Sequence, residues 1–306
     1  MDMRVDFAGI RLNNPVLTAS GTFGFGHEFK PYGDLTALGG MVVKGLSLAP
    51  RQGNPMPRIA ETPCGMLNAI GIQNPGVEAF LRDHLPLLPW REVPVIANLY
   101  ACDAAEFADL AGVLAAEEGV AALEVNVSCP NVREGGMAFG QDPLQIAAVT
   151  EAVKKRAGDT PVIVKLSPNV TDVAACARAA EQGGADGLSL INTLMGMAVD
   201  PVTRRPRLAN VVGGLSGPAI KPVAIRCVFQ AARAVDIPVM GIGGIASAED
   251  VLEFLLVGAH AVQVGTANFL RPDTAFAIAQ ALPAALAAVG ADSLDAYRGS
   301  LELPEF

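Results

Sequence analysis

Eight short apolar runs recur along the chain, and each is bounded by turn-forming residues. Each run is too short for a typical helix, is rich in β-branched residues and is apolar at consecutive positions. This pattern is typical of parallel strands that are covered on both faces. The runs occupy residues 14–20, 39–47, 93–100, 122–130, 161–168, 187–193, 237–244 and 261–269.

Segments with helical periodicity lie between most of these runs and after the last one. Asp103, Asp142, Asp172 and Ser247 stand where helix N-caps are expected, and Ser247 with Asp250 matches a capping box. Strand and helix alternating eight times predict a (β/α)8 TIM barrel, and the GxGxxG fingerprint of a doubly wound sheet is absent. The predicted helices span residues 75–88, 103–118, 142–157, 172–183, 220–235, 247–257 and 273–289.

The remaining segments complete this barrel without a second domain, so we expect one domain over residues 1–306. The opening "VDFAGIRLNNP" predicts a small β-hairpin that closes the bottom of the barrel. Two connections, 47–74 and 194–219, are much longer than the usual two to six residues of such loops. Long structured loops on the strand-exit side of a barrel usually build a site.

Composition and charge narrow the possible partners. Apolar residues make up 51% of the chain and charged residues 17%, which indicates a large globular core. The net charge of −9 argues against nucleic acid, which needs clustered Lys and Arg. The most apolar stretch, 275–290, is short and contains Gln280 and Pro283, so it predicts a surface helix and no membrane span. Since no export or transit signal is visible at the N-terminus, we expect a cytoplasmic protein.

Cysteine and histidine spacing predicts no disulfide framework and no metal site. The five cysteines lack CxxC spacing, and the three histidines are dispersed. Cys176 and Cys227 fall within predicted helices and read as small buried hydrophobic residues. Cys64 and Cys102 lie nearer the expected rim, and their role is open.

Each apolar run ends in a polar residue or a glycine, and in a closed barrel these ends converge on one rim. An unsatisfied buried amide costs about 1–3 kcal/mol and an unpaired charge costs more, so a polar ligand is expected there. The rim residues are Ser20, Lys44, Asn98, Asn126, Cys129, Lys165, Asn192, Thr193, Gly243, Gly244, Gly265 and Thr266.

The rim residues indicate the chemistry of the ligand. Glycines after the seventh and eighth strands, together with the start of the helix at Ser247, predict a phosphate cradle. Lys44 and Lys165 fit either the Schiff-base lysine of a flavin-free aldolase or cations that hold anions and carbonyl oxygens. Asparagines 68, 98, 126 and 192 carry both donors and acceptors, which favours a flat heterocycle.

Cys129 ends the fourth run and precedes Pro130, which turns the chain away from a regular helix. Glycines 135, 136 and 140 follow and would suit a lid over the rim. A thiol at this position fits a nucleophile or a general base. None of the three histidines lies near a strand end, so the general base is favoured.

Five motifs, "NAIGIQNPG", "NVSCPN", "LINT", "GGLSGPAIKP" and "GIGGI", appear in this order along the chain. Together they resemble the class 1 dihydroorotate dehydrogenases over essentially the whole chain. "NAIGIQNPG" with "CPNVREGGMAFG" is similar to the NAD-linked B type, whose catalytic subunit works with a second subunit. The fumarate-linked type and the pyrimidine-reducing domain of dihydropyrimidine dehydrogenases stay open as alternatives.

The resemblance implies oxidation of (S)-dihydroorotate to orotate in pyrimidine biosynthesis, with FMN as cofactor and Cys129 as base. It implies a partner subunit that carries FAD and a [2Fe-2S] cluster, in a heterotetramer built around a homodimer of catalytic chains. The FMN site it implies consists of Ser20, Lys44, Gly45, Asn98, Asn126, Lys165, Ile191, Gly217, Gly243, Gly244, Gly265 and Thr266. The substrate site it implies consists of Lys44, Asn68, Ala69, Ile70, Gly71, Ile72, Asn126, Asn192 and Thr193.

Overall fold

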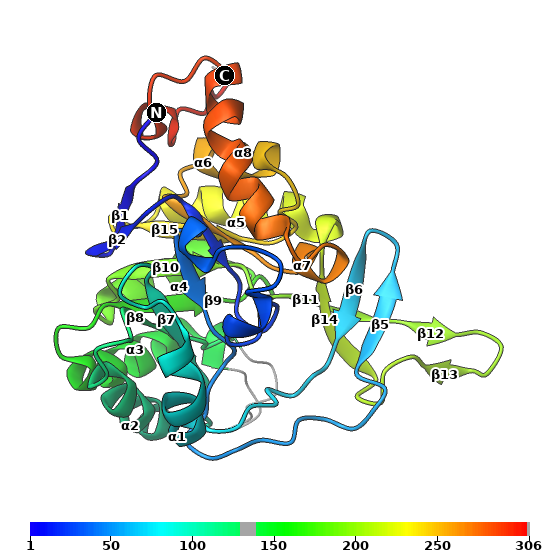
Figure 1. Cartoon of the computed structure of the whole chain (residues 1–306). Coiled ribbons are helices and arrows are strands. Elements are labelled where there is room, and N and C mark those ends of the chain that lie inside the picture. Colours follow the sequence, from blue (N-terminus) through cyan, green and yellow to red (C-terminus); the bar gives the residue numbers. More distant parts are fainter. Residues whose placement is uncertain (129–138, 305–306) are drawn as a thin grey trace.

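A closed barrel of eight parallel strands forms the centre of the protein (Figure 1). The structure is a computed structural model that describes residues 1–128 and 139–304. Each barrel strand pairs with its neighbours in chain order, and β16 pairs with β3 to close the ring. All eight lie inside the runs predicted from the sequence, which confirms the (β/α)8 barrel. The strands are β3 (Val16–Thr18), β4 (Gly40–Val42), β7 (Val95–Leu99), β8 (Ala122–Val125), β9 (Val162–Leu166), β10 (Gly187–Leu190), β15 (Val239–Ile242) and β16 (Ala261–Val264).

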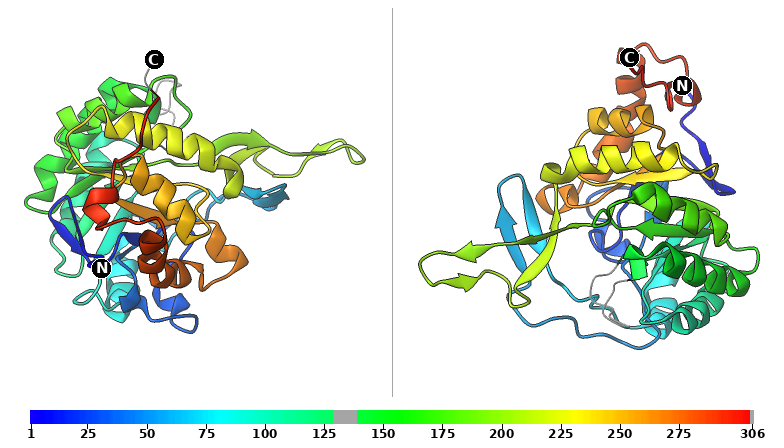
Figure 2. Two further views of the ribbon diagram at one scale, coloured as in Figure 1. Left: turned by 90° about the horizontal axis from the view of Figure 1, so that it is seen from above. Right: turned by 180° about the vertical axis from the view of Figure 1, so that it is seen from behind.

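Every residue of these eight strands is buried, which explains why the runs are apolar at consecutive positions. Helices surround the barrel (Figure 2) and cover its outer face. They are α1 (Val77–Ala79), α2 (Ala104–Ala115), α3 (Pro143–Ala157), α4 (Val173–Gln182), α5 (Lys221–Ala232), α6 (Ala248–Leu256), α7 (Ala267–Leu270), α8 (Thr274–Ala288) and α9 (Leu294–Tyr297). Short 3₁₀ turns lie at His27–Phe29, Leu35–Ala37, Leu85–Leu87, Phe139–Gln141 and Pro218–Ile220.

The predicted helix starts are confirmed by their hydrogen bonds. Asp103, Asp142 and Asp172 each accept a backbone N–H from the first turn of the following helix. Ser247 and Asp250 form a complete capping box. The prediction for 75–88 was less accurate, because α1 ends at Ala79 and continues as a π-helical turn and a 3₁₀ turn containing a proline.

The N-terminal hairpin consists of β1 (Val5–Phe7) and β2 (Ile10–Leu12). Phe7 is fully buried, and its ring lies 3.0 Å from the position that a Cβ on Gly187 would occupy. Because Gly187 is the first residue of β10, the hairpin covers the amino end of the barrel, as the sequence predicted.

The two long connections form a second sheet rather than irregular loops. Its order is β11 (Leu194–Met197), β14 (Val212–Ser216), β6 (Gly65–Asn68) and β5 (Ile59–Thr62), all antiparallel. A two-stranded arm, β12 (Val199–Asp200) with β13 (Arg205–Pro206), projects from this sheet (Figure 2). The sequence predicted structured connections here but not these strands.

The apolar stretch at 275–290 lies largely in α8, which packs against α6 and β3. Its buried residues, such as Phe276 and Leu282, share the helix with exposed ones, so it is a covering helix as predicted. None of the helices in the described ranges combines the length and apolar character needed to cross a bilayer.

Candidate active site

A cavity of about 820 Å³ lies between the carboxyl ends of the barrel strands and the four-stranded sheet. Small-molecule sites typically measure about 300–1,000 Å³. Every predicted site residue in the described part of the chain lines it: Ser20, Lys44, Gly45, Asn68, Ala69, Ile70, Gly71, Ile72, Asn98, Asn126, Lys165, Ile191, Asn192, Thr193, Gly217, Gly243, Gly244, Gly265 and Thr266. The sheet adds wall residues that the sequence did not predict, namely Ile59, Met66, Met195, Val212, Gly213, Gly214 and Ser216.

The predicted base, Cys129, lies outside the described residues, as do Gly135 and Gly136 of the predicted lid. Its neighbour Ser128 is buried and is held by two hydrogen bonds at the cavity wall. Cys64 and Cys102 are exposed and do not line the cavity. Cys176 and Cys227 are buried as predicted, and burial raises the pKa of both thiols.

Glycine turns form one end of the cavity. Gly243 and Gly244 follow β15 with φ of +128° and +77°, a region that favours glycine. On the neighbouring strand, Gly265 and Thr266 follow β16, and the Thr266 hydroxyl donates to Ser216 Oγ at 2.8 Å. These turns leave backbone surface open to a ligand, as a phosphate cradle requires.

The expected contribution of the α6 N-terminus to this cradle was wrong. The Asp250 carboxylate accepts the backbone N–H groups of Ala246 and Ser247 at 2.8 and 2.9 Å. No residue of α6 lines the cavity. The capping box therefore satisfies the N–H groups that a phosphate would have used.

A fully buried carboxylate, Glu124 in the middle of β8, lies beneath the cavity and was missed by the sequence reading. It accepts hydrogen bonds from Asn98 Nδ2 and Gln263 Nε2, both at 2.6 Å, and from Ser189 Oγ at 2.7 Å. Lys165 Nζ lies 3.4 Å from Glu124 Oε2. Burial alone would raise the pKa of Glu124, but the Lys165 charge and the three hydrogen bonds lower it overall.

A second polar cluster joins β8 to β10 at the cavity wall. Asn126 Oδ1 accepts from Ser128 Oγ at 2.7 Å and from Asn192 Nδ2 at 3.3 Å. Asn192 Oδ1 in turn accepts the backbone N–H of Thr193 at 2.8 Å. Because these bonds occupy Asn126 Oδ1, its Nδ2 group is the atom that can donate to a ligand.

The described residues that line the cavity include two lysines, Lys44 and Lys165, and no carboxylate. Lys44 follows β4, and its Nζ lies 3.4 Å from the position of a Cβ on Gly21. Two lysines in the wall favour a ligand with negative charge or carbonyl oxygens.

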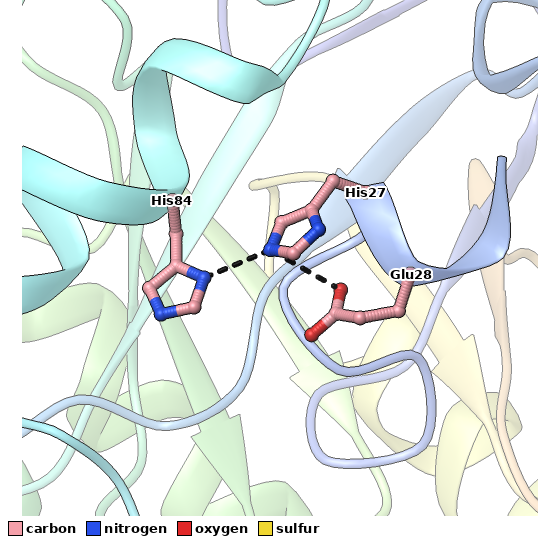
Figure 3. Close-up of side chains that lie close together, drawn as sticks. All are labelled: His27, Glu28 and His84. Carbon is pink, nitrogen blue, oxygen red and sulfur yellow. Dashed lines mark hydrogen bonds and ion pairs between the residues drawn. The ribbon is translucent and has the colours of Figure 1, made fainter.

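His27 and His84 are distant in sequence but adjacent in space (Figure 3). His27 Nε2 lies 2.9 Å from His84 Nδ1, which fits a hydrogen bond between the rings, and 3.8 Å from Glu28 Oε2. Burial, followed by the nearby His27, lowers the pKa of His84. None of the three residues lines the cavity.

The fold and the cavity together define a (β/α)8 barrel protein with a candidate ligand site at the carboxyl ends of its strands. The family model described as Dihydroorotate dehydrogenase matches residues 2–286. The chain belongs to the dihydroorotate dehydrogenase family.

Relatives within this family match the chain over its full length. The chain is 73% identical over 305 residues to a protein of Maridesulfovibrio salexigens, with 100% of both chains covered. It is 71% identical over 303 residues to a protein of Solidesulfovibrio magneticus, with 99% of each covered, and 56% identical over 301 residues to one of Pelobacter propionicus, with 98% of this chain and 99% of the relative covered. All three relatives are named "Dihydroorotate dehydrogenase B (NAD(+)), catalytic subunit".

Proposed function

We propose that this chain oxidises (S)-dihydroorotate to orotate in pyrimidine biosynthesis, as the catalytic subunit of an NAD-linked, B-type dihydroorotate dehydrogenase. The observation that carries the proposal is the 73% identity to a B-type catalytic subunit over all of both chains. The whole chain, residues 1–306, acts as one catalytic domain. The flavin-free aldolase alternative loses its support, because the chain belongs to a different family.

The cavity residues fit FMN as the cofactor. The glycine turns after β15 and β16 suit its phosphate, and the amides and lysines suit its ring, which carries N–H and C=O groups along one edge. Bound FMN supplies the acceptor for the hydride that leaves C6 of the substrate. The residues that hold it are Ser20, Lys44, Gly45, Asn98, Asn126, Lys165, Ile191, Gly217, Gly243, Gly244, Gly265 and Thr266.

The substrate is held on the side of the cavity formed by the four-stranded sheet. Asn68 lies in β6, and residues 69–72 continue from it along the cavity wall. Lys44 attracts the substrate carboxylate, while Asn126, Asn192 and Thr193 supply donors and acceptors to the pyrimidine ring. The hydrogen bonds between Asn126, Ser128 and Asn192 fix these amides in place before the substrate binds.

Cys129 removes the proton from C5 of dihydroorotate. Support comes from the motif "NVSCPN", in which Cys129 follows Ser128, and Ser128 is hydrogen-bonded to Asn126 and Asn192 at the cavity wall. The lysines of the wall stabilise negative charge on the pyrimidine as the proton leaves.

Substitution of Cys129 tests this role. We expect Cys129→Ala to lower kcat by about 10²–10⁴-fold, the usual contribution of a general base, while FMN binding is unchanged. Cys102→Ser is the matched control, because Cys102 is an exposed thiol that does not line the cavity. Near-normal turnover of Cys129→Ala would reject the role.

The electrons leave through a partner subunit. Neither a dinucleotide fingerprint nor a cysteine quartet for an iron–sulfur cluster occurs in the sequence, so NAD⁺ reduction requires another protein. That partner carries FAD and a [2Fe-2S] cluster, and the assembly is a cytoplasmic heterotetramer around a catalytic homodimer. Assays of the isolated chain with fumarate, NAD⁺ and an artificial dye separate this proposal from the fumarate-linked type. The dye alone should support turnover, whereas rapid turnover with fumarate would contradict the B-type assignment.

A further inference from the structure

We propose that Glu124 is a positioning residue for the cavity floor, the part of the wall formed by Asn98 and Lys165. It fixes the orientation of the Asn98 amide and pairs with the Lys165 ammonium group. This inference rests on the proposed binding of FMN. It concerns a residue that does not itself line the cavity.

Glu124 occupies a position that barrels normally fill with apolar side chains. It is 0% exposed and lies in β8, where its neighbours Leu123 and Val125 are also fully buried. Burying a lone carboxylate costs several kcal/mol after relaxation, so the site needs donors to retain it. Four side chains from four other strands supply them: Asn98, Lys165, Ser189 and Gln263.

The carboxylate determines which end of the Asn98 amide meets the cavity. An ionised carboxylate only accepts hydrogen bonds, so Asn98 must turn its Nδ2 group towards Glu124, at 2.6 Å. Its Oδ1 atom then lies 2.8 Å from the position of a Cβ on Gly45, which lines the cavity. The floor therefore presents a hydrogen-bond acceptor at this point, which would suit a donor such as a ring N–H of the flavin.

The same carboxylate balances the charge of Lys165. The Lys165 side chain is 7% exposed and lines the cavity, whereas the Glu124 side chain is 0% exposed behind it. The pair is close to neutral overall and turns its positive end towards the ligand. Removing only the carboxylate would leave net positive charge at the cavity floor, and that charge would stabilise the more negative, reduced form of a flavin bound in the cavity.

This arrangement predicts shifts of opposite sign in the midpoint potential of bound FMN. Glu124→Gln keeps the side-chain shape and an acceptor for Asn98 but removes the charge, so the potential should become more positive than that of the unaltered protein. Lys165→Met removes the opposite charge and should make it more negative. The double variant Glu124→Gln/Lys165→Met removes both charges and should lie between the two.

The experiment measures the midpoint potential by anaerobic dye equilibration and the FMN dissociation constant by fluorescence. Ser189→Ala is the control, since it deletes one neutral donor to Glu124 and should leave the potential close to that of the unaltered protein. The inference is overturned if the midpoint potential of Glu124→Gln is unchanged, or if it becomes more negative, as that of Lys165→Met should.

If Glu124→Gln does not fold, the midpoint potential of the double variant Glu124→Gln/Lys165→Met is compared with that of Lys165→Met. A potential equal to that of Lys165→Met would mean that Glu124 contributes nothing, whereas a return towards the unaltered value supports the pairing. Failure of the unaltered protein to bind FMN would instead contradict the proposed function, so the two failures are distinguishable.

Discussion

One methyl group at Gly45 should disturb the cavity floor through Asn98. A Cβ at Gly45 would lie 2.8 Å from Asn98 Oδ1, closer than real Cβ atoms approach an oxygen. Asn98 is 1% exposed, and its amide is held on Glu124 at 2.6 Å, so it has little freedom to move away. Gly45 does not have a left-handed backbone, so Gly45→Ala tests this contact without backbone strain.

The size of the expected destabilisation follows from the hydrogen bond between Asn98 and Glu124, which Gly45→Ala should break. A hydrogen bond to a charged group contributes about 1.5–3 kcal/mol. The free energy of unfolding of the FMN-free protein should therefore fall by about 1.5–3 kcal/mol in Gly45→Ala. If the loss of the Asn98 orientation weakens FMN binding by the same free energy, FMN should bind about 10–100-fold more weakly, since 1.4 kcal/mol corresponds to a factor of ten.

Urea unfolding of the FMN-free protein and FMN titration measure the two effects. The double-mutant cycle with Asn98→Ala isolates the contact, because Gly45→Ala has nothing to collide with once Asn98 is truncated. Gly112→Ala is the matched control. Gly112 lies in α2, and the atom nearest to its added Cβ would belong to Arg156 at an ordinary 3.4 Å, so the substitution should raise the free energy of unfolding slightly. Additive effects of Gly45→Ala and Asn98→Ala would refute the reasoning.

Two further substitutions test other parts of the structure. Burial, followed by the Arg298 charge, lowers the pKa of His260 to about 4, so the folded state favours the neutral ring. The free energy of unfolding should therefore fall as the pH drops below 6.5. Because His260 is only partly buried, solvent screening reduces the effect, and we expect a loss of about 1–2 kcal/mol at pH 5. His260→Asn should abolish that part of the pH dependence of urea unfolding. Gly244→Ala adds a Cβ 2.7 Å from Lys221 Cβ at a φ of +77°. It should lower the free energy of unfolding by more than Gly290→Ala, which has a similar φ of +73° in open space and should cost about 1–2 kcal/mol. Equal losses would contradict the effect of the Lys221 contact.

The barrel could be predicted from the sequence because the barrel strands are covered on both faces. Burial of every strand residue produces consecutive apolar runs, and the polar residues at their ends meet at one rim by the geometry of parallel strands. This is why Lys44, Asn126 and Gly265 could be assigned to one cavity from sequence alone. The N-caps were equally accessible, because a cap involves residues only two or three positions apart.

The elements that were missed depend on contacts between distant segments. The four-stranded sheet escaped because its strands are short, and β14 contains two consecutive glycines, so they lack a clear hydrophobic alternation. Glu124 escaped because it sits within an apolar run rather than at its end; a lone charged residue in a buried strand was the available signal. His27 and His84 are 57 positions apart, and only the folded chain brings their rings together.

The most direct test of the account is the visible spectrum of the purified chain, recorded before and after anaerobic addition of dihydroorotate. We expect a yellow protein with one FMN per chain, whose flavin absorbance is bleached by one equivalent of dihydroorotate. A colourless protein that does not take up FMN, or bound FMN that dihydroorotate fails to reduce, would contradict it.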